Sequence, residues 1–373
     1  MATNSGGSGG GDSLQFSTKL EVMVNGQKLE DEVVTSVVVE QDIDQPSMAQ
    51  VAVDNITREF SGGVSIGDEI QILFGREGEG EGSAEEVFSG QVATVEPKYS
   101  AEGESVVTLR AFDKLHQLVR GRNSRAWEEK TEKVILSDVL DPYGLSLDTD
   151  LEYDVIHAYQ HNQTDYEFLM HRAKMYGAFV RLDGNKVIVK KPDHERDFRS
   201  DIVLETKDKA DYELRHFSPR MNASEILSEV EVRGWDPIKK EEVVGVATPG
   251  SGPHGRLGPA LGHQMSGGSK KSFSVDSPIF SEEEAKAKAQ SLLYDSMMSF
   301  VTGTGVVAGR SALSAGQVVE VKLYNKDRTF DANYRFNGRY LLSGVTHRYT
   351  REKSGNLGGY QSLVRFRRDA TQS

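Results

Sequence analysis

The sequence predicts a mainly β protein of the α+β class: two related antiparallel, tube-like β-barrel domains with an inserted mixed α/β segment. Three observations support this prediction. Apolar and polar residues alternate in many short runs, which is typical of half-buried strands. A glycine-marked strand pattern occurs once near each end of the chain. The segments with clear helical spacing lie between these two patterns.

The predicted domains follow the order of these patterns along the chain. Residues 1–13 are rich in Gly and Ser and are expected to form a flexible tail. Residues 14–118 contain the strand runs of a first β-barrel, and residues 119–206 form a mixed α/β domain. Residues 207–373 form a second β-barrel, which carries an inserted loop and helix at about 248–300.

Composition limits the class of protein. A chain of 373 residues exceeds the usual size of one hydrophobic core, so more than one domain is expected. The absence of Cys excludes disulfides, thiolate metal sites and Cys nucleophiles. No apolar run approaches the roughly 20 residues that span a bilayer, so membrane insertion is not expected. The net charge of −13 argues against nucleic-acid binding as the main task.

Residues 160–189, "QHNQTDYEFLMHRAKMYGAFVRLDGNKVIV", combine a helix start with several titratable side chains. Thr164 and Glu167 have the spacing of a capping box, in which the two residues satisfy each other's backbone N–H groups. Gly177 can adopt the left-handed conformation that ends a helix. The segment around Gly184 then alternates in a way that predicts a β-hairpin. Thr164, Glu167 and Gly177 are therefore interpreted as structural caps.

A metal site is the alternative interpretation of this stretch, because His161, Asp165, Glu167 and His171 lie close together in sequence. His161 precedes the cap, and His171 lies more than one turn inside the predicted helix. The two histidines therefore do not share one helix face at the i, i+4 spacing that helical zinc sites use. We predict a structural helix with no metal, and we predict further helices in "TEKVILSDVLDPYG" and "SEEEAKAKAQSLLYDSMMSF".

The two glycine-marked patterns predict an internal repeat. "VSIGDEIQILFG" begins at Val64 and "LSAGQVVEVKLY" at Leu313, and each is followed by a similar strand, "FSGQVATVEP" or "LSGVTHRYTR". We interpret this as one barrel unit used twice. The repeat-defining turns would lie at Gly67 and Gly90 in the first copy and at Gly316 and Gly344 in the second. The alternative is that any two glycine-punctuated strand pairs look alike.

No catalytic, cofactor-binding or metal-binding residue is predicted. The glycines of "REGEGEGSAEE" are interleaved with glutamates that would repel phosphate, and "GTGVVAG" follows a helix instead of a strand. Serine-hydrolase, zinc-protease and EF-hand motifs do not occur in the sequence. His347, within a strand-like run, is interpreted as a packed or hydrogen-bonded side chain and not as a base.

Several segments, taken in order, resemble one known family. They are the stretch 160–189, "VEVRGWDPIKKEEVVG", "SEEEAKAKAQSLL", and "ALSAGQVVEVKL" with "FNGRYLLSGVTHRYT". Together they resemble the late control gene D and VgrG family, the central hub proteins of contractile phage tails and related injection machines. The resemblance runs from about Leu14 to Arg368, and it supplies no catalytic residues for the hub region.

The resemblance implies a homotrimer in which each chain contributes two barrels, so that three chains present six similar units to a hexameric inner tube. The expected role is a structural symmetry adaptor between that tube and a trimeric spike, with other baseplate components as partners. Because no spike repeat precedes Ser373, the spike is expected to be a separately encoded protein. Assembly in the bacterial cytoplasm into a phage tail-like particle is also implied, with release of that particle from the cell as an open alternative. The alternative function is a tail-associated cell-wall hydrolase, since carboxylates are plentiful.

Overall fold

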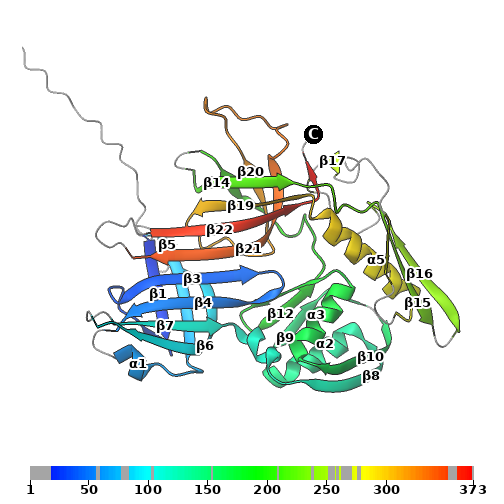
Figure 1. The fold of residues 1–373 in the computed structure, drawn as a ribbon, viewed down its shortest axis with the longest axis horizontal. Helices are drawn as coiled ribbons and strands as arrows, with labels where there is room; N and C mark the ends of the chain where they lie inside the picture. Colours follow the sequence, from blue (N-terminus) through cyan, green and yellow to red (C-terminus); the bar gives the residue numbers. More distant parts are fainter. Residues whose placement is uncertain are drawn as a thin grey trace, which may run out of the picture.

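Most strands of the computed structural model belong to one continuous sheet of 13 strands (Figure 1). The structure describes residues 18–55, 59–76, 84–101, 105–152, 154–207, 210–236, 239–250, 257, 260–261, 271–274, 279–351 and 359–371. Three predicted features lie outside the described residues: the tail at 1–13, the acidic stretch around Gly80, and most of the Gly/Pro-rich loop at 248–271.

The N-terminal part of the sheet, here called the first unit, has the strand order β1-β5-β6-β7-β4-β3. Its strands are β1 (Thr18–Val24), β3 (Val34–Asp42), β4 (Gln45–Asp54), β5 (Glu69–Arg76), β6 (Glu85–Tyr99) and β7 (Ser105–Phe112), with β2 (Gln27–Lys28) beside β1 and a short helix α1 (Glu59–Gly63). Burial alternates along the strands: Val37 and Val39 are fully buried, whereas Val38 is only half-buried. Successive side chains therefore point to opposite faces, and one face forms the apolar core.

The C-terminal part, here called the second unit, has the order β13-β20-β21-β22-β19-β14. Its strands are β13 (Phe198–Glu205), β14 (Tyr212–Met221), β19 (Val301–Ala308), β20 (Val318–Lys322), β21 (Gly338–Thr350) and β22 (Gly359–Arg368). Since β13 also pairs with β14, the unit closes into a barrel. Tyr340 and Phe366 are fully buried inside it and pack edge to face.

The mainly β class and the presence of a closed barrel are thus confirmed, with two differences from the prediction. In the described part of the first unit, β1 and β3 do not pair with each other, so this unit remains an open sheet. In the second unit, β13 runs parallel to both β14 and β20, whereas antiparallel pairing was predicted. The connection from β13 to β20 is long, as parallel pairing requires. Only residues 206–211 separate β13 from β14, and the parallel pairing of these two strands is limited to Leu204 with Tyr212 and Glu205 with Glu213.

The two units share one architecture. Strands β3, β4, β5, β6 and β7 have the same spatial order and pairing directions as β14, β19, β20, β21 and β22. Two β-bulges also recur at equivalent places: between Val34 and Ser36 on β3 and between Leu214 and His216 on β14, then between Val92 and Thr94 on β6 and between Leu342 and Gly344 on β21. Bulges are specific features of a strand pair, so their recurrence supports a true repeat.

Gly67 and Gly316 occupy equivalent turns in front of β5 and β20. Both have positive φ, +98° and +88°, a region that glycine adopts without strain. The N–H of Gly67 donates to the carbonyl of Val92 at 2.8 Å, and that of Gly316 donates to the carbonyl of Leu342 at 2.8 Å. These two glycines therefore begin the same β-turn-strand pattern in both units.

Gly90 and Gly344, which were predicted as turns, lie instead inside strands β6 and β21. They are not equivalent to each other either, because strand pairing with β5 and β20 aligns Gly90 with Tyr340. A Cβ atom at Gly90 would lie 2.3 Å from the carbonyl oxygen of Phe112. Close approach to the neighbouring strand, and not a turn, explains the glycine at position 90.

The two units join through antiparallel pairing of β3 with β21, from Asp42 opposite Gly344 to Ser36 opposite Thr350; we call this contact the seam (Figure 1). An ion pair between Arg365 and Asp42 lies at one end. At the other end, Arg351 forms an ion pair with Asp54 at 2.6 Å. The seam therefore makes one sheet out of two units that are far apart in the sequence.

A mixed α/β domain lies between β7 and β13. Its elements are a 3-10 helix (Lys114–Val119), β8 (Asn123–Thr131), α2 (Glu132–Leu140), a second 3-10 helix (Asp141–Tyr143), β9 (Ser146–Thr149), β10 (Asp154–Gln163), α3 (Asp165–Met175), β11 (Phe179–Asp183) and β12 (Lys186–Lys190). The helices predicted in this segment are α2 and α3. Strands β11 and β12 form the predicted hairpin, with Gly184 at a φ of +58°.

A second insertion lies between β14 and β19 and contains the third predicted helix. Its elements are β15 (Glu229–Asp236), β16 (Glu241–Ala247), β17 (Ala260–Leu261), β18 (Lys271–Ser274) and α5 (Glu282–Met297), and β17 pairs with the C-terminal β23 (Ala370–Thr371). Helix α5 packs on β15 and β16 and also contacts α3. The predicted domain boundary at residue 206 falls after β13, although that strand belongs to the second unit.

Replacing Gly90 by Ala should destabilise the protein by about 1 to 3 kcal/mol, because the added methyl group would overlap the backbone of β7. The matched control is Gly344→Ala, where the added atom would meet the guanidinium of Arg365, the movable end of a flexible side chain. Urea unfolding of both variants measures the difference. Equal losses at the two positions would contradict this account of Gly90.

Candidate functional site

The capping box predicted in front of α3 is present in the structure. The hydroxyl of Thr164 accepts the backbone N–H of Glu167 at 3.0 Å, and the Glu167 carboxylate accepts the backbone N–H of Thr164 at 3.0 Å. Gly177 follows the helix with a φ of +71°, in the left-handed region. All three residues therefore have structural contacts at the ends of α3.

Asp165, the first residue of α3, is 1% exposed and collects hydrogen bonds from several elements. Its carboxylate accepts from Arg125 at 2.8 Å, Gln160 at 2.7 Å, Asn123 at 3.0 Å and the Tyr143 hydroxyl at 2.8 Å. Burial raises the pKa of Asp165, but these hydrogen bonds and the charge of Arg125 lower it below its usual value overall. Asp165 is thus an ionised anchor that ties α3 to β8 and β10.

The two histidines of the same stretch do not join this network. His161 lies on β10 and His171 on α3, and both are exposed. Within the described ranges, no group of three or more His, Asp or Glu side chains is placed to hold a metal ion. The described helices also include none that is long and apolar enough to cross a membrane.

A buried charge cluster, which the sequence analysis did not single out, joins three helices. Arg172 on α3 donates from Nε to Glu132 of α2 at 2.9 Å and forms a second bond to the same carboxylate. Glu284 of α5 lies 4.0 Å from Arg172, and the Tyr176 hydroxyl lies 3.1 Å from it. Burial lowers the pKa of Arg172, but its carboxylate partners raise it overall, so it stays charged. The sequence signal for this cluster was the presence of charged residues, Glu132 and Arg172, at positions of α2 and α3 that otherwise face the core.

His347 lies on β21 at the seam and is fully buried. Its Nε2 lies 3.1 Å from the carbonyl oxygen of Leu313, and its Nδ1 lies 2.7 Å from the hydroxyl of Tyr360. The carbonyl can only accept, so Nε2 carries the proton and Nδ1 accepts from Tyr360. Burial lowers the pKa of His347 to about 4, although the Leu313 contact raises it. The predicted structural role is confirmed, because the neutral ring packs and hydrogen-bonds inside the sheet.

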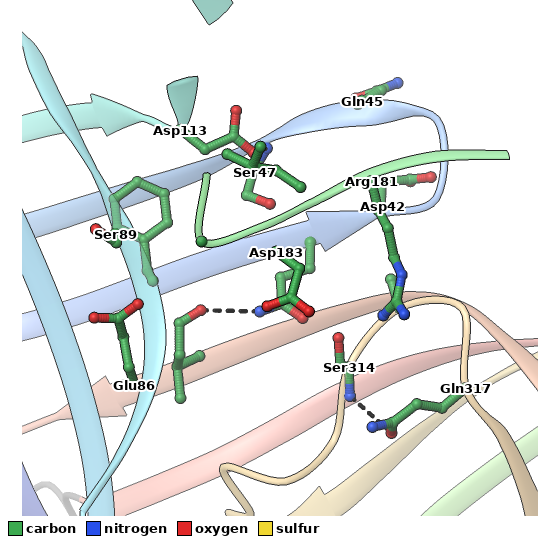
Figure 2. A pocket seen from close by; sticks show the side chains of 16 residues that line it. Asp42, Gln45, Ser47, Glu86, Ser89, Asp113, Arg181, Asp183, Ser314 and Gln317 are labelled. Atoms are coloured by element: carbon green, nitrogen blue, oxygen red, sulfur yellow. Dashed lines mark hydrogen bonds between the residues drawn. The ribbon is translucent and has the colours of Figure 1, made fainter. Parts of the chain in front are cut away.

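A cavity of about 250 Å³ lies where both units meet the mixed domain (Figure 2). It is lined from β3 by Asp42, from β6 by Glu86, from the mixed domain by Arg181, and from the loop before β20 by Ser314. Asp113, directly after β7, and Asp183, at the end of β11, also belong to the acidic part of the lining. The cavity is the place in the described structure where a hydrolytic carboxylate pair would be sought.

Asp113 and Asp42 in this lining already have structural contacts. The two oxygens of Asp113 accept the backbone N–H groups of Ser47 at 2.7 Å and Leu115 at 3.0 Å, which joins β4 to the first 3-10 helix. Burial raises the pKa of Asp113 to about 6 despite these bonds. Asp42 is paired with Arg365 across the units. The arrangement therefore serves the junction between the parts of the chain.

Comparison with protein families gives a match over nearly the whole chain. The family described as Alg8 N-terminal domain matches residues 15–351. No curated protein matches the sequence.

Solved structures with the same fold come from phage tails and secretion machines. The 43 kDa tail protein of prophage MuSo2 from Shewanella oneidensis has a TM-score of 0.66 at 14% identity, covering 95% of this chain and 100% of that one. A tail protein from Neisseria meningitidis has a TM-score of 0.68 at 13% identity, covering 95% and 97%. An E. coli type VI secretion component, similar in structure to the T4 tail proteins gp27 and gp5, has a TM-score of 0.54 at 10% identity, covering 92% and 76%.

Replacing Thr164 by Ala should lower the free energy of unfolding by about 0.5 to 2 kcal/mol, because the N-cap hydrogen bond is lost. Thr131→Ala is the matched control, since Thr131 occupies the N-cap of α2 without a side-chain cap bond. Chemical denaturation should show a clearly smaller loss for the control. A loss at position 131 as large as that at 164 would contradict the assigned capping role.

His347 should make stability depend on pH. Its pKa falls from 6.5 in the unfolded chain to about 4 in the fold, so its contribution is fully present above pH 6.5 and is lost as the pH falls towards 4. The size of this shift corresponds to about 3 kcal/mol. Relative to His347→Gln, the natural protein should lose stability steeply on acidification. An exposed control, His161→Gln, should keep the natural pH dependence; a pH-independent difference at position 347 would refute the assignment.

Proposed function

Since the chain belongs to the Alg8 N-terminal domain family and has the fold of phage tail and type VI secretion proteins, we propose that it is a structural central hub. In this proposal the protein belongs to the baseplate of a phage tail or contractile injection system. It joins a hexameric inner tube to a trimeric spike as a symmetry adaptor. The particle is assembled in the bacterial cytoplasm and can be released from the cell.

The observation that carries the proposal is the repeated unit. One chain contains two sheet units with the same strand order and the same two bulges. Three chains therefore supply six similar units, which matches the number of subunits in a hexameric ring. The partners in this proposal are two further copies of the chain, the inner tube protein, a separately encoded spike and other baseplate components.

The proposal assigns no reaction, cofactor, nucleic-acid specificity or membrane insertion to the chain. The alternative is a tail-associated cell-wall hydrolase, for which the cavity around Asp113 would be the place of reaction. The structural contacts of Asp113 and Asp42 favour the hub over the enzyme.

Zymography on peptidoglycan separates the two functions. The purified chain should produce no cleared band, whereas a known hydrolase in the same gel should. Clearing by the chain that disappears in Asp113→Asn would favour the enzyme.

A reconstruction of the assembled particle should show three copies of this chain, with the tube on one side of the ring and the spike on the other. The physical reason is that two units per chain match six tube subunits only when three chains close the ring. Weak association of the isolated chain is compatible with this expectation, because tube and spike add further interface. A hub with any other copy number would overturn the proposed symmetry adaptor.

A further inference from the structure

The seam within the chain uses two strand edges, and the repeat provides each of them a second time. The seam joins the C-terminal part of β21 to β3. By the shared strand order, β6 is the counterpart of β21, and β14 is the counterpart of β3. We therefore expect β6 of the first unit to have an edge like the one that β21 uses in the seam, and β14 of the second unit to have an edge like that of β3.

Both counterpart edges are open in the described structure. Strand β5 pairs with β6 only up to Gln91. From Thr94 to Lys98, β6 therefore pairs with a described strand, β7, along one side only. Strand β13 pairs with β14 only at Tyr212 and Glu213, so the remainder of β14 is bonded along one side to β19. An open edge presents backbone groups that another strand can pair with.

We propose that the open edge of β6 pairs with the open edge of β14 in a second copy of the chain. The contact repeats the geometry of the seam between chains. It is a head-to-tail contact, which closes into a ring when the rotation between copies permits. The inference rests on the proposed homotrimer and adds the strands and the register that hold it together.

The register follows from the equivalent bulges. The first residue after the bulge is Thr94 on β6 and Gly344 on β21, so these two residues are equivalent. In the same way, the first residue after the bulge is His216 on β14 and Ser36 on β3, so these two are equivalent. Transfer of the seam register then gives the pairs between one chain and the next: Thr94 with Asn222, Val95 with Met221, Glu96 with Arg220, Pro97 with Pro219, Lys98 with Ser218, and Tyr99 with Phe217.

The side chains on the two faces of this ladder match. On one face, apolar residues of β6 meet apolar residues of β14 in three successive pairs: Val95 with Met221, Pro97 with Pro219, and Tyr99 with Phe217. Tyr99 is 57% exposed in the single chain, whereas its counterpart at the seam, Tyr349, is only half-buried; Pro97 is likewise exposed, and its counterpart His347 is buried. The same contact between chains would therefore remove Pro97 and Tyr99, and the still accessible parts of the half-buried residues facing them, from water.

The opposite face of the ladder is polar and contains one pair of opposite charges. Glu96 lies directly opposite Arg220, and both side chains are exposed in the single chain. Glu96 has an exposed ion pair with Arg110 at 3.5 Å, which leaves room for a second cation. Opposite charges at directly facing positions stabilise a strand pair.

The β14 edge also has space for an incoming strand. A groove of about 490 Å³ lies beside it, and its lining includes Phe217 and Pro219 of β14 together with Tyr334 and Phe336. Ile66, which is 70% exposed, precedes Gly67 as Ala315 precedes Gly316, and Ala315 is buried. The exposed apolar side chain thus stands where the second unit has a covered one.

The facing prolines make the contact between chains weaker than the seam. At the two ends of the seam, the backbone N–H of Ile43 donates to the carbonyl of Ser343, and that of Arg351 donates to the carbonyl of Thr35. Hydrogen-bonded and non-hydrogen-bonded pairs alternate along an antiparallel ladder, so Val39 and His347 form a doubly hydrogen-bonded pair. The equivalent pair is Pro97 with Pro219, and neither residue has an N–H to donate. The ladder between chains therefore lacks two hydrogen bonds, yet it leaves no N–H unpaired at this point.

Engineered disulfides test the register, and the natural chain has no Cys to interfere. Glu96→Cys combined with Arg220→Cys places both thiols at a non-hydrogen-bonded pair, where Cα atoms lie about 4.5 Å apart and a disulfide fits. Oxidation of the double variant in the assembled particle should give covalent trimer on a non-reducing gel. Glu96→Cys with Ser218→Cys shifts one partner by about 7 Å along β14 and should leave the chain mostly uncrosslinked.

A control within the chain uses the equivalent seam pair. Glu40→Cys with Thr346→Cys should form a disulfide inside one chain, without covalent oligomers. If the hub is trimeric but the pair at 96 and 220 does not crosslink while the seam pair does, the proposed edges are wrong and the hub proposal stands. If the hub is not trimeric, both proposals fail.

A charge exchange gives a second readout. Glu96→Arg or Arg220→Glu alone should weaken association between chains about two- to fivefold, and the two changes together should restore it. Additive weakening in the double variant would contradict direct pairing of these residues.

Discussion

The shared use of β21 is the interaction on which the rest of the structure depends. The N-terminal part of this strand pairs with β20 inside the closed barrel, and the part after the bulge at Ser343 pairs with β3 of the first unit. A bulge redirects a strand, so one strand can serve two neighbours along the same side. His347 fills the interior at the junction as a neutral, doubly hydrogen-bonded ring. Without this strand the molecule would separate into two sheets.

The mixed domain and the second insertion are held by polar contacts of a different kind. Arg172, Glu132 and Glu284 bring together α2, α3 and α5, elements from two separate parts of the chain. Removing one member of such a buried cluster leaves an uncompensated charge, which typically costs about 3 to 5 kcal/mol. The hydroxyl of Ser291 on α5 adds a hydrogen bond to the carbonyl of Lys174 at 2.8 Å. These directional polar contacts therefore fix the relative positions of α2, α3 and α5 more closely than apolar packing alone would.

Local features of the fold were predictable from the sequence, and nonlocal ones were not. The capping box at Thr164, the hairpin at Gly184 and the turn glycines Gly67 and Gly316 depend on neighbouring residues, so their patterns are visible in the sequence. The close approach that requires Gly90, and the pairing of β13 with strands on both sides, depend on segments distant in sequence. The buried role of Arg172 likewise appears only when three helices meet. The repeat was detectable because its turns recur, although Gly344 suggested the wrong alignment.

The long interval between the strands of the seam has a consequence for synthesis. Strand β3 is made early and joins β4 through a tight hairpin, whereas β21 emerges only after the mixed domain and the second insertion. Contacts between such distant segments form slowly, because a long loop must close first. During translation the edge of β3 is therefore exposed while its own partner is absent, and a finished β21 from a neighbouring ribosome could occupy it. Exchange of this strand between nascent chains is therefore a misassembly that this architecture permits.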